Sequence, residues 1–125
     1  MKYLLDSNIL IAISLDANER VIARVGVCDA GDLVTSAVAY AEVVHGSERG
    51  KPPPIERLNV LIEEIPVLPF DASAAQAYAS LAFARHSYDR LIAAHALSLG
   101  LTIVTDNEKH FADVPGLRVE NWTSE

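Results

Sequence analysis

Short apolar runs alternate along this chain with longer stretches that carry helical signals, and this alternation limits the possible folds more than any other feature. Apolar strands are predicted at residues 2–5, 32–35, 65–70 and 101–105, with a last short strand near 117–119. The prolines within 65–70 indicate a strand that is short or lies at an edge of the sheet. Strands that are separated by helices form parallel sheets with helices on both faces, so the sequence predicts an α/β fold. The order of the strands stays open.

Helical patterns fill the spaces between these strands, and several of them begin at a residue type that caps helices. The expected helices run from Ile9 onward, over 17–27, from Ser36 toward His45, over 55–64, from Asp71 or Ser73 to about Arg85, and over 88–99. Ser87 is the expected cap of the last helix, and Gly100 its end. With 125 residues, the chain is expected to form one domain over 1–125.

Composition indicates a cytoplasmic protein without a membrane segment. The single cysteine, Cys28, cannot form an internal disulfide, and no apolar run approaches the roughly 18 residues that suggest a membrane span. The net charge of −7 argues against a nucleic-acid partner, because phosphate backbones usually meet a positive surface. An acidic balance also arises where carboxylates collect around divalent cations, which reverse the local field. Composition leaves both readings open.

Two aspartates follow predicted strands directly. Asp6 comes after the first strand, and Asp106 comes after the strand over 101–105. Ligands of open parallel sheets bind beyond the carboxyl ends of the strands, so both side chains are predicted at that edge. The alternative for each is a helix cap or a turn, where aspartate is common for structural reasons.

Two further acids lie within apolar helical stretches. Glu42 belongs to the stretch 37–44, which is apolar almost all round and is therefore predicted to be largely buried. An unpaired buried carboxylate costs several kcal/mol, so metal coordination or a raised pKa is the favoured explanation over an exposed or paired glutamate. Asp89 lies in the first turn of its helix, on the same face as Ile92. An acid there also complements the helix dipole without any function.

Several carboxylates at one sheet edge cannot all stay ionised without compensating charge. Hard cations such as Mg²⁺ or Mn²⁺ supply that charge and prefer oxygen ligands. Carboxylate-held metals suit phosphoryl chemistry, because they polarise the phosphate and activate water. The sequence contains no cysteine and histidine cluster with zinc spacing, and no phosphate-binding glycine loop or serine-nucleophile motif.

Sequence motifs along almost the whole chain resemble those of VapC-type PIN-domain toxins. The motifs are Leu5-Asp6-Ser7-Asn8, Ala41-Glu42, 88–96 around Asp89, Val104-Thr105-Asp106-Asn107 and 114–122, which ends in Trp122. The resemblance implies a PIN-like three-layer α/β/α sandwich with a central, mostly parallel sheet. It also implies Mg²⁺- or Mn²⁺-dependent cleavage of RNA, which leaves a 5′-phosphate and a 3′-hydroxyl. A homodimer and a cognate antitoxin are the implied protein partners.

The resemblance also assigns roles to individual residues. The implied metal ligands are Asp6, Glu42, Asp89 and Asp106, and the remaining catalytic positions are Ser7 and Asn107. Family members vary between aspartate and asparagine at the fourth acidic position, so Asn107 is the alternative to Asp106.

Basic residues at the rim are the candidate RNA contacts: Arg85, Arg90 and Lys109, with His86 and His110 ranked lower. For each of them the alternative is an ordinary solvated surface. The link Arg85-His86-Ser87 is shorter than in related chains, which puts substrate selection in doubt. His95, between alanines, is expected to be a packed, hydrogen-bonded histidine, and Trp122 is expected to hold the C-terminal segment against the body.

Two other functions stay open from the residues alone. A metal-dependent phosphatase would use Asp6 as nucleophile and needs an acid two residues later, where Asn8 stands. A receiver-like or other protein-binding module would need an acid pair after the first strand, and Asp6 has no acidic neighbour.

Overall fold

Among the residues that the structure describes, five parallel strands form the centre of the molecule. The structure, a computed structural model, describes residues 1–81 and 87–124. The strands are β1 (Tyr3–Leu5), β2 (Leu33–Ser36), β3 (Val67–Leu68), β4 (Thr102–Val104) and β5 (Val119–Glu120), in the spatial order β3-β2-β1-β4-β5. Neighbouring strands pair in parallel, which confirms the α/β prediction. The central strand β1 lies between β2 and β4, where the chain changes direction across the sheet.

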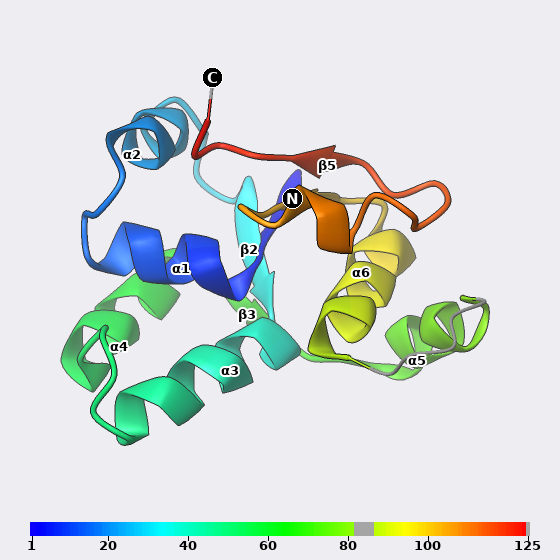
Figure 1. Cartoon of the computed structure of the whole chain (residues 1–125), viewed down its shortest axis with the longest axis horizontal. Coiled ribbons are helices and arrows are strands. Elements are labelled where there is room, and N and C mark those ends of the chain that lie inside the picture. The colour runs from blue at the N-terminus through cyan, green and yellow to red at the C-terminus, as the bar shows by residue number, and fades with distance from the viewer. Residues whose placement is uncertain (82–86, 125) are drawn as a thin grey trace.

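Helices cover both faces of this sheet (Figure 1). On one side lie α1 (Ser7–Ser14), α3 (Ala37–Glu48) and α4 (Ile55–Glu64), with α2 (Glu19–Gly26) in contact with α1. On the other side lie α5 (Ala72–Ala79) and α6 (Tyr88–Leu99), and a short 3-10 helix, η1 (Glu108–His110), follows β4. The predicted three-layer α/β/α arrangement is confirmed.

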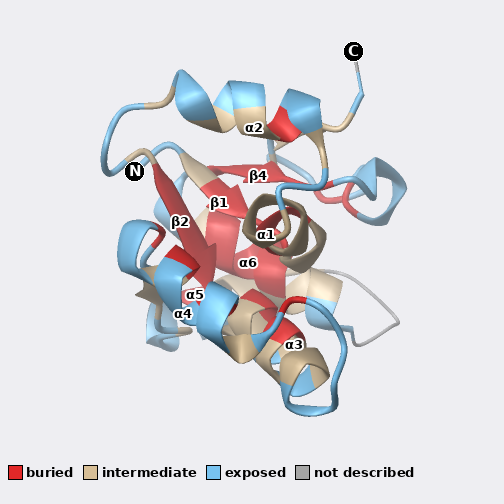
Figure 2. Ribbon diagram, turned by 90° about the vertical axis from the view of Figure 1, so that its left-hand side faces the viewer, coloured by how far each residue is buried: buried red, intermediate tan, exposed pale blue. Residues whose placement is uncertain are grey.

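The core lies where the central strands meet the helices of both layers. Leu4, Leu5 and Ile103 are fully buried, as are Ile9 of α1 and Ile92 of α6. Figure 2 shows the same pattern, with buried segments in β1, β2, β4 and α6. Strands covered on both faces require apolar side chains in both directions, which explains the continuous apolar runs of the sequence.

Capping side chains fix most helix boundaries. Ser36 and Ser87 accept hydrogen bonds from Val38 N and Arg90 N, as predicted, and Asp71 rather than Ser73 caps α5. Gly100 ends α6 in the left-handed region, with φ of +67°, a conformation that favours glycine.

Several predicted boundaries are wrong, among them that of the strand expected over 65–70, which spans only Val67–Leu68. The second helix begins at Glu19 rather than residue 17, because the side chain of Asn18 caps it. Helix α5 ends at Ala79 and not near Arg85, since the hydroxyl of Ser80 donates a hydrogen bond to Ala77 O; residues 82–86 lie outside the described part of the chain. The last strand begins at Val119, because a turn joins Leu117 N to Val114 O.

The C-terminal segment is fixed to the body by Trp122, as predicted. Its ring is buried and meets Tyr3 edge-on at 5.0 Å between ring centroids, and Arg24 lies 4.8 Å from it on its face. The indole nitrogen donates to Glu120 Oε1 over 2.8 Å. Within the described residues, none of the helices combines the length and apolar character that a membrane span requires.

Candidate active site

Three acidic side chains from three different elements meet near the carboxyl end of the sheet. Asp6 follows β1, Glu42 lies on α3 in one helical layer, and Asp89 lies in the first turn of α6 in the other layer. Burial is the largest cause of the raised pKa of Asp6 and of Glu42, but the charge of Asp89 also raises that of Asp6, and the charges of Asp6 and Asp89 also raise that of Glu42. The structure therefore brings together these three of the four acids that the sequence predicts as metal ligands.

Asp6 is buried, with 2% of its surface exposed. Its Oδ1 accepts a hydrogen bond from Ser7 N at 2.8 Å, so Asp6 is the N-cap of α1 as well as a member of the acidic site. Its Oδ2 accepts from Thr105 Oγ1 at 2.8 Å and from Asn8 Nδ2 at 3.2 Å. Burial raises the pKa of Asp6, while the hydrogen bonds from Thr105, Ser7 and Asn8 act in the opposite direction. The carboxylate is thus held in one orientation.

Glu42 is half-buried and lacks such support. Its Oε1 is buried without a hydrogen-bond partner among the described residues. Burial, followed by the negative charges of Asp6 and Asp89, raises the pKa of Glu42 to about 7. The stretch 37–44 is less buried than the sequence predicts, because only Ala39 and Val43 are buried and Ala41 is exposed. The predicted buried, unpaired carboxylate is nevertheless present, since α3 turns Glu42 toward the interior.

Asp89 is partly exposed and interacts with a histidine. His110 Nδ1 lies 2.8 Å from Asp89 Oδ2, and the exposed fractions of the two side chains are 56% and 31%. His110 belongs to η1, which the sequence analysis did not predict. His110 was predicted only as an RNA contact, and its place beside Asp89 could not be predicted because the two residues are far apart in the sequence.

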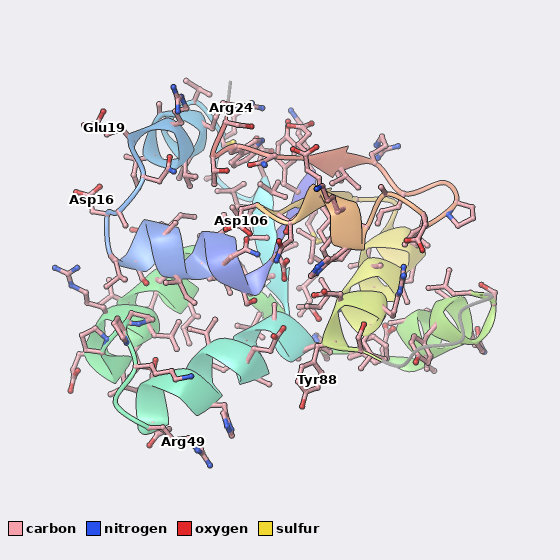
Figure 3. The ribbon with its side chains drawn as sticks, in the orientation of Figure 1. Asp16, Glu19, Arg24, Arg49, Tyr88 and Asp106 are labelled. Atoms are coloured by element: carbon pink, nitrogen blue, oxygen red, sulfur yellow. The ribbon has the colours of Figure 1, made fainter. Side chains whose placement is uncertain are left out.

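The end of β4 contributes a threonine rather than an acid. Thr105 is fully buried, donates to Asp6, and accepts a hydrogen bond from Asn107 N at 3.0 Å. Asp106 is exposed and lies beside the first turn of α1, where its backbone nitrogen donates to Asn8 Oδ1 at 3.2 Å (Figure 3). Neither Asp106 nor Asn107 is among the groups that shift the pKa of Asp6 or Glu42. The sequence signal that could have revealed Thr105 was its position at the end of an apolar strand, directly before Asp106.

The predicted RNA-contacting residues differ in their surroundings. Arg90 forms two hydrogen bonds with Asp113, at 2.8 and 3.0 Å, and this pairing raises the pKa of Arg90. Lys109 is exposed on η1. Arg85 and His86 lie outside the described residues, as does most of the short link before Ser87. His95 is buried with its Nδ1 2.8 Å from Ser36 Oγ, as expected for a structural histidine.

The acids suit a hard divalent cation by their chemistry, although their side chains do not form a closed metal cage. In the part of the chain that the structure describes, no three histidine, cysteine or acidic side chains are arranged closely enough to hold an ion. Mg²⁺ usually takes only one or two carboxylates and keeps several waters, so a preformed cage is not required. The unpartnered Glu42 Oε1 is an oxygen ligand without a competing hydrogen bond. The residues present therefore fit Mg²⁺ or Mn²⁺.

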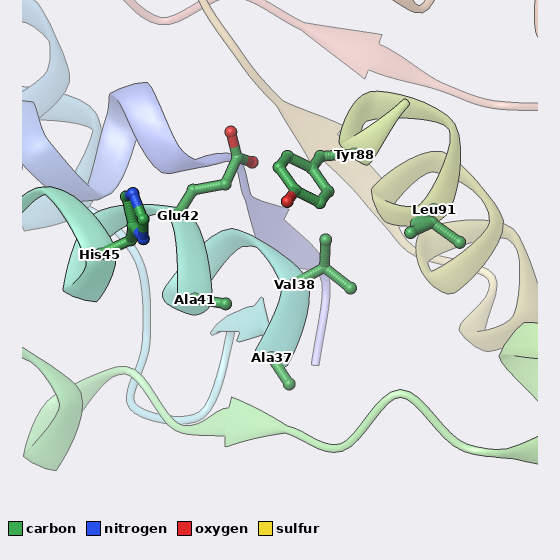
Figure 4. A pocket seen from close by; sticks show the side chains of 7 residues that line it. All are labelled: Ala37, Val38, Ala41, Glu42, His45, Tyr88 and Leu91. Carbon is green, nitrogen blue, oxygen red and sulfur yellow. The ribbon is translucent and has the colours of Figure 1, made fainter. Parts of the chain in front are cut away.

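A pocket adjoins these acids. It has a volume of about 570 Å³ and lies between α3 and α6, lined by Ala37, Val38, Ala41, Glu42, His45, Tyr88 and Leu91. Figure 4 shows Glu42 on α3 and Tyr88 at the start of α6 pointing toward one another across it.

Comparison with known proteins agrees with this fold. The family model described as PIN domain matches residues 3–117. The chain is 37% identical to the tRNA(fMet)-specific endonuclease VapC of Shigella flexneri, over 98% of this chain and 99% of that protein. The crystal structure of DNA-bound VapBC from Salmonella typhimurium superimposes with a TM-score of 0.80 at 32% identity, covering 98% of both chains. VapBC-1 from nontypeable Haemophilus influenzae gives a TM-score of 0.85 at 29% identity, covering 99% of this chain and all of that one.

A parallel sheet of order β3-β2-β1-β4-β5 with acids at its carboxyl end is thus the fold of a PIN domain. The chain belongs to the PIN domain family and, within it, to the VapC ribonucleases. The resemblance found in the sequence is confirmed, and of the three functions left open it favours the nuclease.

Proposed function

We propose that this chain is the endoribonuclease toxin of a type II toxin–antitoxin pair and cleaves RNA with a divalent metal ion held by Asp6, Glu42 and Asp89. The observation that supports metal dependence is the environment of Glu42. Its buried Oε1 has no partner among the described residues, and burial, followed by the charges of Asp6 and Asp89, raises the pKa of Glu42 to about 7. Three acids at one site need positive charge to remain ionised together, and Mg²⁺ or Mn²⁺ supplies it.

The protein residues would divide the work at this site. When bound, the ion would polarise the phosphodiester and activate water for its hydrolysis. Asp6 offers a carboxylate that Thr105, Asn8 and the Ser7 backbone hold in place. Glu42 and Asp89 approach from opposite helical layers. Asp106 and Asn107 follow at the end of β4, where we place the fourth ligand position, and Ser7 stands beside Asp6 at the start of α1.

The partners of the chain follow from the family. The matched Salmonella and Haemophilus structures are VapBC complexes, and we infer that this chain likewise binds a cognate antitoxin. We place it in the cytoplasm as a homodimer, with RNA as its substrate and Lys109, Arg90 and Arg85 as basic groups at the rim. The Shigella relative is named for tRNA(fMet), which makes initiator tRNA the first RNA to test.

The test is cleavage of a tRNA pool that contains tRNA(fMet), by antitoxin-free protein, with Mg²⁺, Mn²⁺ or EDTA. We expect cutting with either metal, none with EDTA, and none by Asp89→Asn in either metal. The matched control is Asp16→Asn, which makes the same change at an exposed acid beyond the far end of α1 (Figure 3). Asparagine tolerates the φ of +52° at that position. Cutting in EDTA, or undiminished cutting by Asp89→Asn, would contradict the proposal.

A further inference from the structure

The pocket between α3 and α6 has the size and lining of a ligand site. Its volume of about 570 Å³ lies within the range of pockets that bind small organic groups, roughly 300–1,000 Å³. Most of its wall is apolar and comes from Ala37, Val38, Ala41 and Leu91. A few polar groups stand among them, and such a combination is typical of sites that bind a flat, largely apolar ligand in one orientation.

Two aromatic rings stand at this pocket on different helices. Tyr88, the first residue of α6, keeps 63% of its surface exposed although it is a large apolar ring. His45 lines the pocket from α3, and Figure 4 shows Glu42 between the two rings. An exposed tyrosine that lines a pocket is available for stacking against a ligand.

The pocket is continuous with the acidic site. Glu42 lines the pocket and belongs to the acidic site, and Tyr88 directly precedes Asp89 in the chain. Whatever occupies the pocket therefore lies next to the phosphodiester that the acids would address.

The net charge of the chain limits which part of an RNA could bind in this pocket. With a net charge of −7, the chain attracts phosphate groups weakly, so contacts to the backbone alone give little affinity for RNA. Stacking of bases on aromatic side chains does not depend on a positive surface, because every base has a π-face.

We propose that the pocket between α3 and α6 holds one unpaired nucleobase of the RNA strand beside the bond that is cut, with Tyr88 stacked on that base. This inference rests on the proposed ribonuclease function and adds to it a base-binding pocket and a stacking residue. A base reaches such a pocket only when it is unstacked from its neighbours, so the base must leave its stack before the adjacent bond is cut.

The experiment removes the ring and the base separately and then together. A single-stranded RNA with a mapped cut site is prepared in versions that each lack one base near the cut. We expect one abasic position to lower kcat/KM of the unmodified protein about tenfold, and Tyr88→Ala to lower it about tenfold on intact RNA. The two losses should not add, because both remove the same contact. Tyr88→Phe, the matched control, keeps the ring and should retain most of the activity.

Binding without cleavage gives a second readout. The fluorescent base 2-aminopurine, at the sensitive position of the same RNA, should be quenched when the RNA binds the Asp6→Asn protein with Mg²⁺, and Tyr88→Ala in that background should abolish the quenching. Thermal unfolding should show that Tyr88→Ala remains folded, as expected for an exposed side chain.

Three results would overturn the inference. Additive losses would mean that Tyr88 and the base do not meet, and equal damage by Tyr88→Phe and Tyr88→Ala would exclude stacking. Dissociation of an oligomer by Tyr88→Ala, measured by light scattering, would show that a second copy covers the pocket. If the unmodified protein cuts RNA and these results appear, only the inference fails. If it cuts no RNA with either metal, the proposed function fails and the inference with it.

Discussion

Asp6 and Glu42 are both withdrawn from water at the same site, yet the two carboxylates differ in their hydrogen bonds. Asp6 accepts three hydrogen bonds, from Ser7, Asn8 and Thr105. Glu42 has a buried oxygen with no partner within the described part of the chain. An unsatisfied buried acceptor costs about 1–3 kcal/mol or more when it is charged, so Glu42 destabilises the metal-free protein.

The difference assigns two roles to acids that look alike in the sequence. The hydrogen bonds of Asp6 fix its orientation before any ligand arrives, which favours precise placement of a bound group. The negative charge of Glu42 is not neutralised until a proton or a cation binds to it. One acid is pre-organised, and the other couples ligand binding to stability.

The largest effect is expected where the pre-organised acid loses its charge. Asp6→Asn keeps an oxygen that can accept from Ser7 N, so the cap of α1 and the fold should persist. We expect the rate of RNA cleavage to fall at least about 100-fold, because loss of a metal ligand exceeds the effect of changing a residue that supports one. Single-turnover cleavage measures the rate, and thermal unfolding checks the fold. A variant that is folded and fully active would show that Asp6 is not a metal ligand.

The second effect concerns pH and Glu42. Its pKa in the folded protein is about 7, above the ordinary value of 4.5, so the folded state holds the proton more tightly than the unfolded state does. The free energy of unfolding should therefore fall as the pH rises from about 4.5 to 7, by about 2 kcal/mol for this half-buried side chain.

Urea unfolding in EDTA across this pH range measures that slope. Glu42→Gln should flatten it and stabilise the protein above pH 7, whereas Glu63→Gln, at an exposed position of α4, should leave it unchanged. An identical slope in Glu42→Gln and the unmodified protein would show that Glu42 finds a partner in solution.

A smaller loss is expected from the residue that orients Asp6. Thr105→Val keeps the shape of the side chain but removes the hydrogen bond to Asp6 Oδ2. The affinity for Mn²⁺, measured by calorimetric titration, should fall about tenfold. Thr102→Val, a buried threonine at the other end of β4, should leave that affinity unchanged. Equal affinity in Thr105→Val and the unmodified protein would mean that Asp6 needs no support.

The smallest effect is expected from removing the exposed histidine partner of Asp89. His110→Ala removes the contact at 2.8 Å, but exposed pairs of this kind contribute only about 0.2–1 kcal/mol. The Mn²⁺ affinity should therefore change no more than about threefold. A loss of Mn²⁺ affinity as large as that of Thr105→Val would show that His110, like Thr105, positions a carboxylate.

The sequence predicted the parts of the site that follow from local rules. Asp6 could be placed because it ends a strand, and Glu42 and Asp89 because apolar helical patterns surround them. The caps Ser36 and Ser87 could be read for the same reason. Each of these predictions depends only on neighbours within a few residues.

The remaining features depend on contacts between distant segments. His110 beside Asp89 and Asp113 beside Arg90 are set by the path of the chain after β4, which no periodicity describes. The pocket beside Tyr88 exists only because α3 and α6, from opposite layers, approach one another at the end of the sheet. The placement of Asp106 at the metal remains a prediction.

The three acids also have a mechanical consequence, because they belong to three layers of the fold. Asp6 continues from the sheet, while Glu42 and Asp89 are carried by helices that pack on opposite faces of it. Shared coordination by these side chains would cross-link α3 and α6 across the open end of the sheet. Loading of the site would then slow local opening of both helices, so that the same event that equips the protein for chemistry also protects it from proteolysis.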